Sequence, residues 1–313
     1  MRYRFGPDYP DATYVPHGYP ELTADLGEVV MNYATAGSPD SPALVLIPGQ
    51  TESWWGYEAA MKILQADFQV FAIDLRGQGR SSRTPGRYTL DNIAGDVVRF
   101  IQIVVGRPAF VSGLSSGGVI SAWLSAFAPP GLVKACVYED PPLYSSQGSP
   151  ACGQGIRQAI GPMFARFAKF LGPQWSIGDW EGFLADAAGT TVNLTASGDA
   201  APPAPPQTLK EYDPEWGHAF WTGSVYAGCD HDLMLTKVKT PVLLTHHSRH
   251  VEERSGRLLG ALSDIQAGRV KERVEATGQP LDYQSFPQMG HSMHGQDPEL
   301  YARAVTAWLL AAR

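Results

Sequence analysis

The chain has 313 residues, a length that suits one large α/β domain carrying an insertion, and its 44% hydrophobic and 18% charged residues are typical of a folded globular protein. The formal net charge of −7 argues against nucleic acid or an anionic membrane surface as a partner, because both attract basic proteins. Three cysteines without a C-x-x-C pair indicate neither a disulfide framework nor a structural zinc site.

No apolar run approaches the roughly 20 residues that a membrane-spanning helix needs. The first residues, Met1 to Pro7, lack the apolar core of a signal peptide, so a cytoplasmic location is the default expectation. The sequence specifies no oligomeric state, and a homo-oligomer stays open.

Short, continuously apolar segments, each followed by a helical pattern, make up most of the first half of the chain. Residues 22–25 and 29–34 can pair across a turn at Gly27-Glu28, which predicts an antiparallel hairpin. Strands are then predicted at residues 43–47, 69–74, 108–113 and 133–138, and a helix at 91–105. Buried strands of this kind are typical of a mostly parallel central sheet flanked by helices.

Residues 145–235 have a different character. They are rich in aromatics, they show helical spacing from Ile156 to Phe170, and a proline-rich run at 201–206 predicts an exposed loop. We interpret them as a mainly helical cap inserted into the core, which comprises residues 1–144 and 236–313. The second part of the core is predicted to hold strands at 241–245 and 281–286 and helices at 256–276 and 298–310.

The strongest chemical signal is the pentapeptide Gly113-Leu114-Ser115-Ser116-Gly117, which lies between a predicted strand and a predicted helix. A G-x-S-x-G motif in this setting places its serine on a tight turn above the sheet, and the glycines let the strand and helix approach each other. The helix N-terminus favours negative charge at that point. The motif therefore predicts that Ser115 is a catalytic nucleophile.

An oxyanion hole requires two N–H donors near this serine. The backbone N–H of Ser116 is the first candidate. The second is the N–H of Gln50, which follows the glycine in the loop after the strand at 43–47.

The general base is predicted from Met289-Gly290-His291, between the last predicted strand and the last helix. His291 is favoured over His294 because it follows the glycine and lies nearer the strand. A separate histidine cluster at 246, 247 and 250 has no carboxylate or cysteine at a familiar ligand spacing, so we predict no metal site.

The third member of a catalytic triad is less clearly marked. No aspartate follows the strand at 241–245 within the expected loop, but Glu139 and Asp140 stand at the end of the preceding strand. Either carboxylate could orient the imidazole and stabilise its cation. We choose Glu139, with Asp140 as the second candidate and Asp264 as the third.

With these residues in place, the chain resembles the α/β-hydrolases, and the segment 74–81 (DLRGQGRS) looks like their D-x-R-G-x-G-x-S motif, which is structural in that family. More narrowly, it resembles bacterial zearalenone lactonases. The stretches that carry this likeness are 25–33 (DLGEVVMNY), 53–55 (SWW), 113–118 (GLSSGG), 174–180 (QWSIGDW) and 209–217 (LKEYDPEWG). The last two lie in the cap.

This resemblance implies an α/β-hydrolase fold and hydrolysis of the ester in an aromatic resorcylic macrolactone, without a metal or organic cofactor. It also implies an acid after the sixth strand, which matches Glu139. Five aromatic residues are predicted to line the substrate pocket: Trp54, Trp55, Trp180, Trp216 and Tyr226.

Other functions remain open on the same motifs. A general carboxylesterase or a hydrolase of carbon–carbon bonds would use the same triad. A receptor of this fold would bind the lactone without multiple turnovers. Epoxide hydrolases and haloalkane dehalogenases are disfavoured, because they carry an aspartate where this chain has Ser115.

Overall fold

The computed structural model describes residues 13–144, 157–158, 161–187, 204–254 and 257–312. Their centre is an eight-stranded sheet with the order β1-β2-β4-β3-β5-β6-β8-β11. The strands are β1 (Leu22–Asp25), β2 (Val30–Ala36), β3 (Ala43–Ile47), β4 (Gln69–Ile73), β5 (Ala109–Leu114), β6 (Val133–Glu139), β8 (Val242–His246) and β11 (Leu281–Ser285). All neighbours from β4 to β11 are parallel, whereas β2 is antiparallel to both β1 and β4. The predicted hairpin and the mostly parallel sheet are confirmed.

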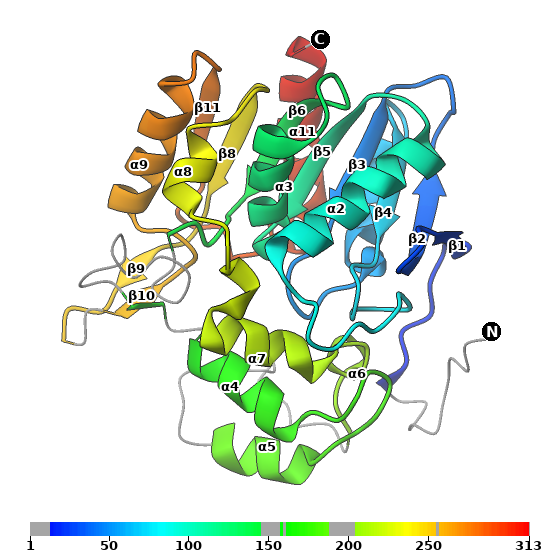
Figure 1. The fold of residues 1–313 in the computed structure, drawn as a ribbon, viewed down its shortest axis with the longest axis vertical. Coiled ribbons are helices and arrows are strands. Elements are labelled where there is room, and N and C mark those ends of the chain that lie inside the picture. The colour runs from blue at the N-terminus through cyan, green and yellow to red at the C-terminus, as the bar shows by residue number, and fades with distance from the viewer. Residues whose placement is uncertain (1–12, 145–156, 159–160, 188–203, 255–256, 313) are drawn as a thin grey trace.

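Helices cover both faces of this sheet (Figure 1). On one face lie α2 (Leu90–Phe100), α3 (Ser116–Phe127), α8 (His231–Leu235) and α9 (Asp264–Glu275), and on the other α1 (Glu58–Leu64), α10 (Met293–Gln296) and α11 (Pro298–Ala311). Each face has its own apolar core, because the side chains of every strand alternate between the two. Within the described ranges, no helix is both long and apolar enough to cross a lipid bilayer.

The helix predicted at 91–105 is present, with a change of winding near its end. Thr89 caps α2 by accepting a hydrogen bond from the Asn92 N–H at 3.4 Å, and the apolar stripe of the helix faces the core. The last turn, Ile101–Val105, is π-helical, and Gly106 ends it with a φ of 66°.

The inserted segment is mainly helical where the structure describes it. It contains α4 (Gly161–Phe170), α5 (Trp180–Ala187), α6 (Gln207–Lys210), α7 (Pro214–Thr222) and the short 3-10 helix Ser224–Tyr226. Helix α4 packs between α5 and α7, and these helices lie together at one end of the sheet (Figure 1). The last helix of the predicted cap, α8, instead packs on α3 and α9 of the core.

Three local predictions are wrong. The helix expected from 156 starts at Gly161, because Arg157–Gln158 form a strand, β7, parallel to β10 (Arg257–Leu259). The helix expected from 256 starts at Asp264, because β10 pairs with β7 and with β9 (His250–Val251), and a capping box joins Ser263 and Gln266. In the proline-rich loop, Ala204 and Pro205 are buried and not exposed, and residues 201–203 lie outside the described ranges.

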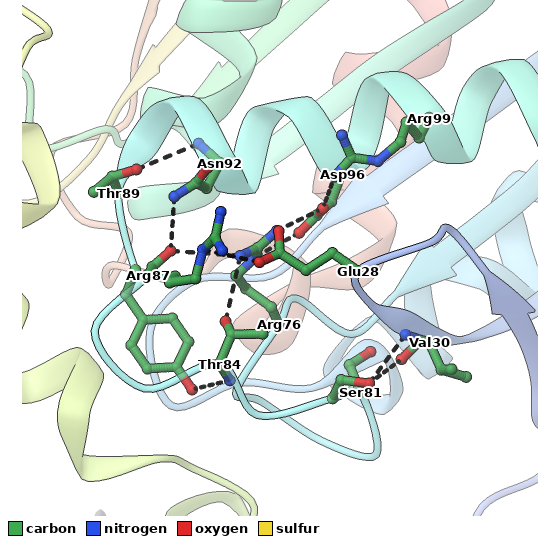
Figure 2. A network of polar contacts seen from close by, with 12 residues as sticks. Glu28, Val30, Arg76, Ser81, Thr84, Arg87, Thr89, Asn92, Asp96 and Arg99 are labelled. Atoms are coloured by element: carbon green, nitrogen blue, oxygen red, sulfur yellow. Dashed lines mark hydrogen bonds and ion pairs between the residues drawn. The ribbon is translucent and has the colours of Figure 1, made fainter.

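A buried arginine holds the segment that follows β4, which carries the D-x-R-G-x-G-x-S motif. Arg76 is fully buried and makes a two-bond ion pair with Asp96 of α2, at 2.6 and 2.8 Å (Figure 2). It also contacts Glu28 at 3.2 Å, Thr84 Oγ1 at 3.3 Å and the carbonyl of Arg87 at 3.5 Å. This network joins the β1–β2 turn, the loop after β4 and α2.

Candidate active site

Ser115 lies on the sharp turn between β5 and α3. Its φ of 55° and ψ of −118° are unfavourable for a residue with a side chain, as expected for a strained nucleophile turn. The flanking glycines are required by contact distances. A Cβ on Gly113 would lie 2.1 Å from the carbonyl oxygen of Gly117, and a Cβ on Gly117 would lie 2.4 Å from that of Ile47. The sequence thus forms the predicted turn because only glycine lets strand and helix approach so closely.

The carboxylate in contact with His291 is Asp140, not Glu139. Asp140 Oδ2 lies 2.6 Å from His291 Nδ1, and the Asp140 side chain is buried while the His291 side chain is 49% exposed. Our choice of Glu139 as the acid that orients His291 is therefore wrong in this geometry. Asp264, the third candidate, is on α9 and pairs with Arg249 at an exposed position.

The reason for this correction lies in the alternation of β6. Ala135 and Val137 face the core beneath α1 and α11, whereas Cys136 and Tyr138 face the opposite core. Glu139 continues the first set, so its carboxylate enters the interior on the α11 side. Asp140 comes after the strand and has a φ of 41°, which turns its side chain toward the loop that carries His291.

Glu139 forms a second histidine–carboxylate pair. His294 Nδ1 lies 3.0 Å from Glu139 Oε2, and Glu139 Oε1 accepts the N–H groups of Met293 and His294 at 2.8 and 3.1 Å. The other ring nitrogen of His294 faces Glu52 at 3.6 Å, and the ring stacks on Tyr57 with centroids 3.7 Å apart. His294 is fully buried, so it cannot serve as a surface base.

In both histidine–carboxylate pairs, the charge of the partner outweighs the effect of burial on the pKa. Burial raises the pKa of Asp140, but the hydrogen bond and charge of His291 outweigh it, and the pKa lies below its usual value. Desolvation lowers the pKa of His291, but the bond and charge of Asp140 reverse this and the pKa is raised. For His294, burial again lowers the pKa, and the charges of Glu139 and Glu52 raise it above the ordinary value.

His247 supports the loop that carries His291. Its N–H donates to Asp140 Oδ1 at 3.1 Å, and its Nδ1 lies 3.0 Å from the carbonyl oxygens of both Gly290 and His291. His246 bonds instead to the Tyr283 hydroxyl and the Leu262 carbonyl, and His250 lies in β9. Both buried rings of the cluster thus have protein partners.

The loop after β3 lies against the nucleophile. A Cβ on Gly49 would be 3.3 Å from Ser115 Cβ, and the side-chain amide of Gln50 donates to Ser116 Oγ at 3.2 Å. The backbone N–H groups of Gln50 and Ser116 have no hydrogen-bond acceptor among the residues that the structure describes. Two free donors beside Ser115 are what an oxyanion hole requires.

No hydrogen bond joins Ser115 Oγ to His291 within the described part of the chain. Catalytic hydrogen bonds are often long or misaligned without substrate, and the His291 side chain is half-exposed, so this geometry does not argue against its role as the base. The nucleophile, base and acid thus come from β5, the loop after β11 and the end of β6, which the sheet brings to one edge.

The five aromatic residues predicted for the pocket have different positions. Trp54 is fully buried and donates to Glu21 at 2.8 Å, and Trp216 is 1% exposed and donates to the Arg76 carbonyl at 2.7 Å. Neither offers a ring face to a ligand, so these two predictions are wrong. Trp180 and Tyr226 are also buried, against Phe183 and His231 respectively. Trp55 is half-buried and stays a prediction.

The sequence reasoning missed several residues of this site. Glu52 and Tyr212 were not singled out, and His247 was considered only as a metal ligand, although each bonds to a residue of the loops around Ser115. For the choice between Glu139 and Asp140, the alternation of side chains along β6 was a usable signal, and it favoured Asp140 as the partner of His291. For the other three no local pattern exists, because their contacts join segments far apart in the chain.

These features are those of one family of enzymes. The chain matches the alpha/beta hydrolase family over residues 44–304 and belongs to it.

Among curated relatives, 3-oxoadipate enol-lactonase 2 of Acinetobacter baylyi is 34% identical over 110 residues, which is 34% of this chain and 40% of that protein. Epoxide hydrolase B of Mycobacterium tuberculosis is 36% identical over 104 residues, 31% of this chain and 29% of its own length. The chain therefore spans less than half of each relative.

Solved structures share the fold over a greater length. The enol-lactonase from Burkholderia xenovorans has a TM-score of 0.63 at 16% identity and covers 92% of this chain and 100% of its own. A serine hydrolase involved in carbazole degradation has a TM-score of 0.61 at 19% identity, with 94% and 100% covered. At these identities the likeness shows the fold.

Proposed function

We propose that this protein is a serine-dependent lactonase that opens the ring of zearalenone or a related resorcylic macrolactone. One observation supports the chemistry above all others: Ser115 occupies a strained turn beside the loop of Gln50, the backbone N–H groups of Gln50 and Ser116 have no acceptor in the described ranges, and His291, from the same edge of the sheet, is bonded to a buried aspartate. The substrate class rests on the resemblance to zearalenone lactonases in the core and the cap. The name of one relative, 3-oxoadipate enol-lactonase 2, also supports a lactone as the substrate.

In the proposed mechanism, Ser115 Oγ attacks the lactone carbonyl carbon and its proton passes to His291 Nε2. Asp140 holds Nδ1–H at 2.6 Å, which leaves Nε2 as the accepting nitrogen and stabilises the imidazolium. The N–H groups of Gln50 and Ser116 donate to the oxyanion. Collapse of the tetrahedral intermediate breaks the ring C–O bond, and the alkoxide takes the proton from His291.

The second half of the reaction reverses these roles. Water attacks the acyl-enzyme carbonyl and gives a proton to His291, and the ester bond to Ser115 then breaks. His291 returns that proton to Ser115 Oγ, and the carboxylate product leaves. The overall change is the addition of one water across the ester.

The test is zearalenone hydrolysis by the purified protein, followed by chromatography, beside a Ser115→Ala variant. We expect ring opening that disappears in the variant. If zearalenone persists while p-nitrophenyl esters are cleaved through Ser115, the enzyme is a general esterase and the lactonase proposal is refuted. Tight lactone binding without multiple turnovers would identify a receptor.

A further inference from the structure

A tyrosine of the inserted segment contacts the loop that follows β3. We call this loop, residues 48–52, the oxyanion loop, because it carries Gln50. Tyr212 lies between α6 and α7, is fully buried, and donates its hydroxyl to Gln50 Oε1 at 2.8 Å. The same amide donates through Nε2 to Ser116 Oγ at 3.2 Å. One side chain thus links the cap to the residue after the nucleophile. The two residues joined in this way are those whose backbone N–H groups are the proposed oxyanion donors.

Adjacent residues anchor the same cap turn to other parts of the core. Glu211 accepts hydrogen bonds from Ser53 Oγ and from Trp55 Nε1, the latter at 3.0 Å. Asp213 accepts from Tyr88 at 2.5 Å and from Arg83 at 2.8 Å. Because these contacts fix the turn on both sides of Tyr212, its hydroxyl is held in place independently of Gln50.

The hydrogen bonds within the oxyanion loop join residues that are close in the chain, and none of them reaches the cap. Thr51 has a φ of 61°, a left-handed conformation that a β-branched residue adopts only when its surroundings impose it. Gly49 and Glu52 exchange two long hydrogen bonds, from the Gly49 N–H to Glu52 Oε2 at 3.3 Å and from the Glu52 N–H to the Gly49 carbonyl at 3.4 Å, and Thr51 Oγ1 donates to the Gln50 carbonyl at 2.6 Å. Burial raises the pKa of Tyr212 well above its ordinary value, so the phenol keeps the proton that it donates to Gln50.

We infer that Tyr212 is a positioning residue through which the docked cap sets the geometry of the oxyanion donors Gln50 and Ser116. This inference rests on the proposed function. Oxyanion donors act only when held at hydrogen-bond distance from the developing charge, so a loop that loses its outer restraint stabilises the transition state less. Ground-state binding does not depend on this geometry, so kcat should fall while KM changes little.

The test compares Tyr212→Phe with Tyr88→Phe. Both substitutions remove one buried phenol hydroxyl that joins core and cap, but Tyr88 bonds to Asp213 and not to Gln50. In Tyr88→Phe the turn keeps the two bonds from Arg83 to Asp213, at 2.8 and 3.2 Å, so Tyr212 should stay in place. With p-nitrophenyl acetate, Tyr212→Phe should lower kcat about 10- to 100-fold, less than the 10²- to 10³-fold of a fully lost donor. The KM of Tyr212→Phe should stay within about threefold of the wild-type value. The kcat of Tyr88→Phe should stay within about twofold of the wild-type value.

A double-mutant cycle with Gln50→Ala tests the route, because that variant keeps the backbone N–H and removes the same bond from its other end. Tyr212→Phe should have little further effect in the Gln50→Ala background. The inference would be overturned if the losses in kcat from Tyr212→Phe and Gln50→Ala multiplied in the double variant. It would also be overturned if Tyr212→Phe and Tyr88→Phe had equal kcat values. Should Tyr212→Phe fail to fold by circular dichroism, a normal kcat in Gln50→Ala alone would overturn it, and a reduced one would support it.

Failure of the proposed function gives a different result. Wild-type protein that cleaves neither zearalenone nor p-nitrophenyl acetate faster than Ser115→Ala would refute the function, and the inference with it. An active wild type with a normal Tyr212→Phe variant overturns the inference alone.

Discussion

Replacing Asp140 by asparagine should nearly abolish turnover. Asp140 Oδ1 accepts the N–H of His247 at 3.1 Å, and Oδ2 accepts from His291 Nδ1 at 2.6 Å. Asparagine has a single acceptor oxygen. Since the backbone N–H of His247 is fixed as a donor, the amide NH₂ would face His291 Nδ1, and the ring proton would move to Nε2. That nitrogen could then no longer take the proton of Ser115.

The expected loss in kcat is about 10⁴-fold, the size known for this substitution in a Ser-His-Asp triad. At about 1.4 kcal/mol for each factor of ten, this corresponds to about 5 kcal/mol of transition-state stabilisation. The assay is steady-state cleavage of p-nitrophenyl acetate at pH 8, with thermal unfolding followed by circular dichroism on the same samples.

Glu139→Gln is the matched control, one residue earlier in the chain. Glutamine still offers one acceptor to the N–H groups of Met293 and His294, but the buried pair with His294 loses its negative charge. We expect a lower free energy of unfolding, by about 3 kcal/mol, the lower end for a broken buried pair. Activity below the unfolding temperature should remain within about tenfold of wild type, because His291 keeps Asp140.

The opposite pattern would refute this reasoning. If Glu139→Gln lost about 10⁴-fold in kcat while Asp140→Asn stayed active, Glu139 would be the acid in solution. The loop at 290–294 would then have a different conformation in solution, in which His291 bonds to Glu139. Equal losses in both variants, with normal stability, would show that the two pairs act as one unit.

Three further predictions concern other parts of the structure. Because Asp140 raises the pKa of His291, and the base must be neutral, kcat/KM should fall as the pH drops through a value above the ordinary one of about 6.5; a pH–rate profile checks this. Gly117→Ala should prevent formation of the nucleophile turn and eliminate activity, whereas Gly268→Ala, in open space on α9, should raise the free energy of unfolding by about 0.5–1 kcal/mol, measured by urea denaturation. Asp96→Ala should destabilise the fold by about 3 kcal/mol in the same assay, the lower end for a broken buried pair, because it removes both bonds from Arg76 to its fully buried carboxylate and leaves the contact with Glu28 at 3.2 Å as the remaining ion pair.

The sheet was predictable from the sequence because its strands are buried on both faces. A parallel strand covered by helices on each side needs an unbroken apolar run, and such runs mark β3, β4, β5, β6 and β8 to within one residue. The small sheet of β7, β9 and β10 was missed for the opposite reason. Its strands have two or three residues each, too few for a recognisable apolar run, and β10 pairs with β7, about 100 residues earlier in the chain, as well as with the nearby β9. No local pattern encodes such pairs.

The pocket aromatics show a different limit of sequence reasoning. A tryptophan or tyrosine in the cap needs a partner for its polar atom whether it contacts a ligand or fills a core. Trp216 finds that partner in the Arg76 carbonyl and stacks on Tyr88 at 5.1 Å, which makes it the joint between cap and core. The residue type fitted both functions, and only the packing distinguished them.

Backbone strain offers evidence for the site that is independent of any resemblance. In the described ranges, five residues other than glycine have a positive φ: Thr51, Ser115, Asp140, Tyr144 and Trp175. Each costs free energy that the surrounding structure must offset, and such residues cluster where function requires a fixed but unfavourable geometry. Three of the five fall on the oxyanion loop, the nucleophile and the acid that bonds His291. A fourth, Trp175, lies at the contact between cap and core, where it donates to the Gly79 carbonyl at 2.9 Å. The distribution of strain therefore identifies the same residues as the hydrogen bonds do, and it favours Asp140 over Glu139 as the acid of the triad.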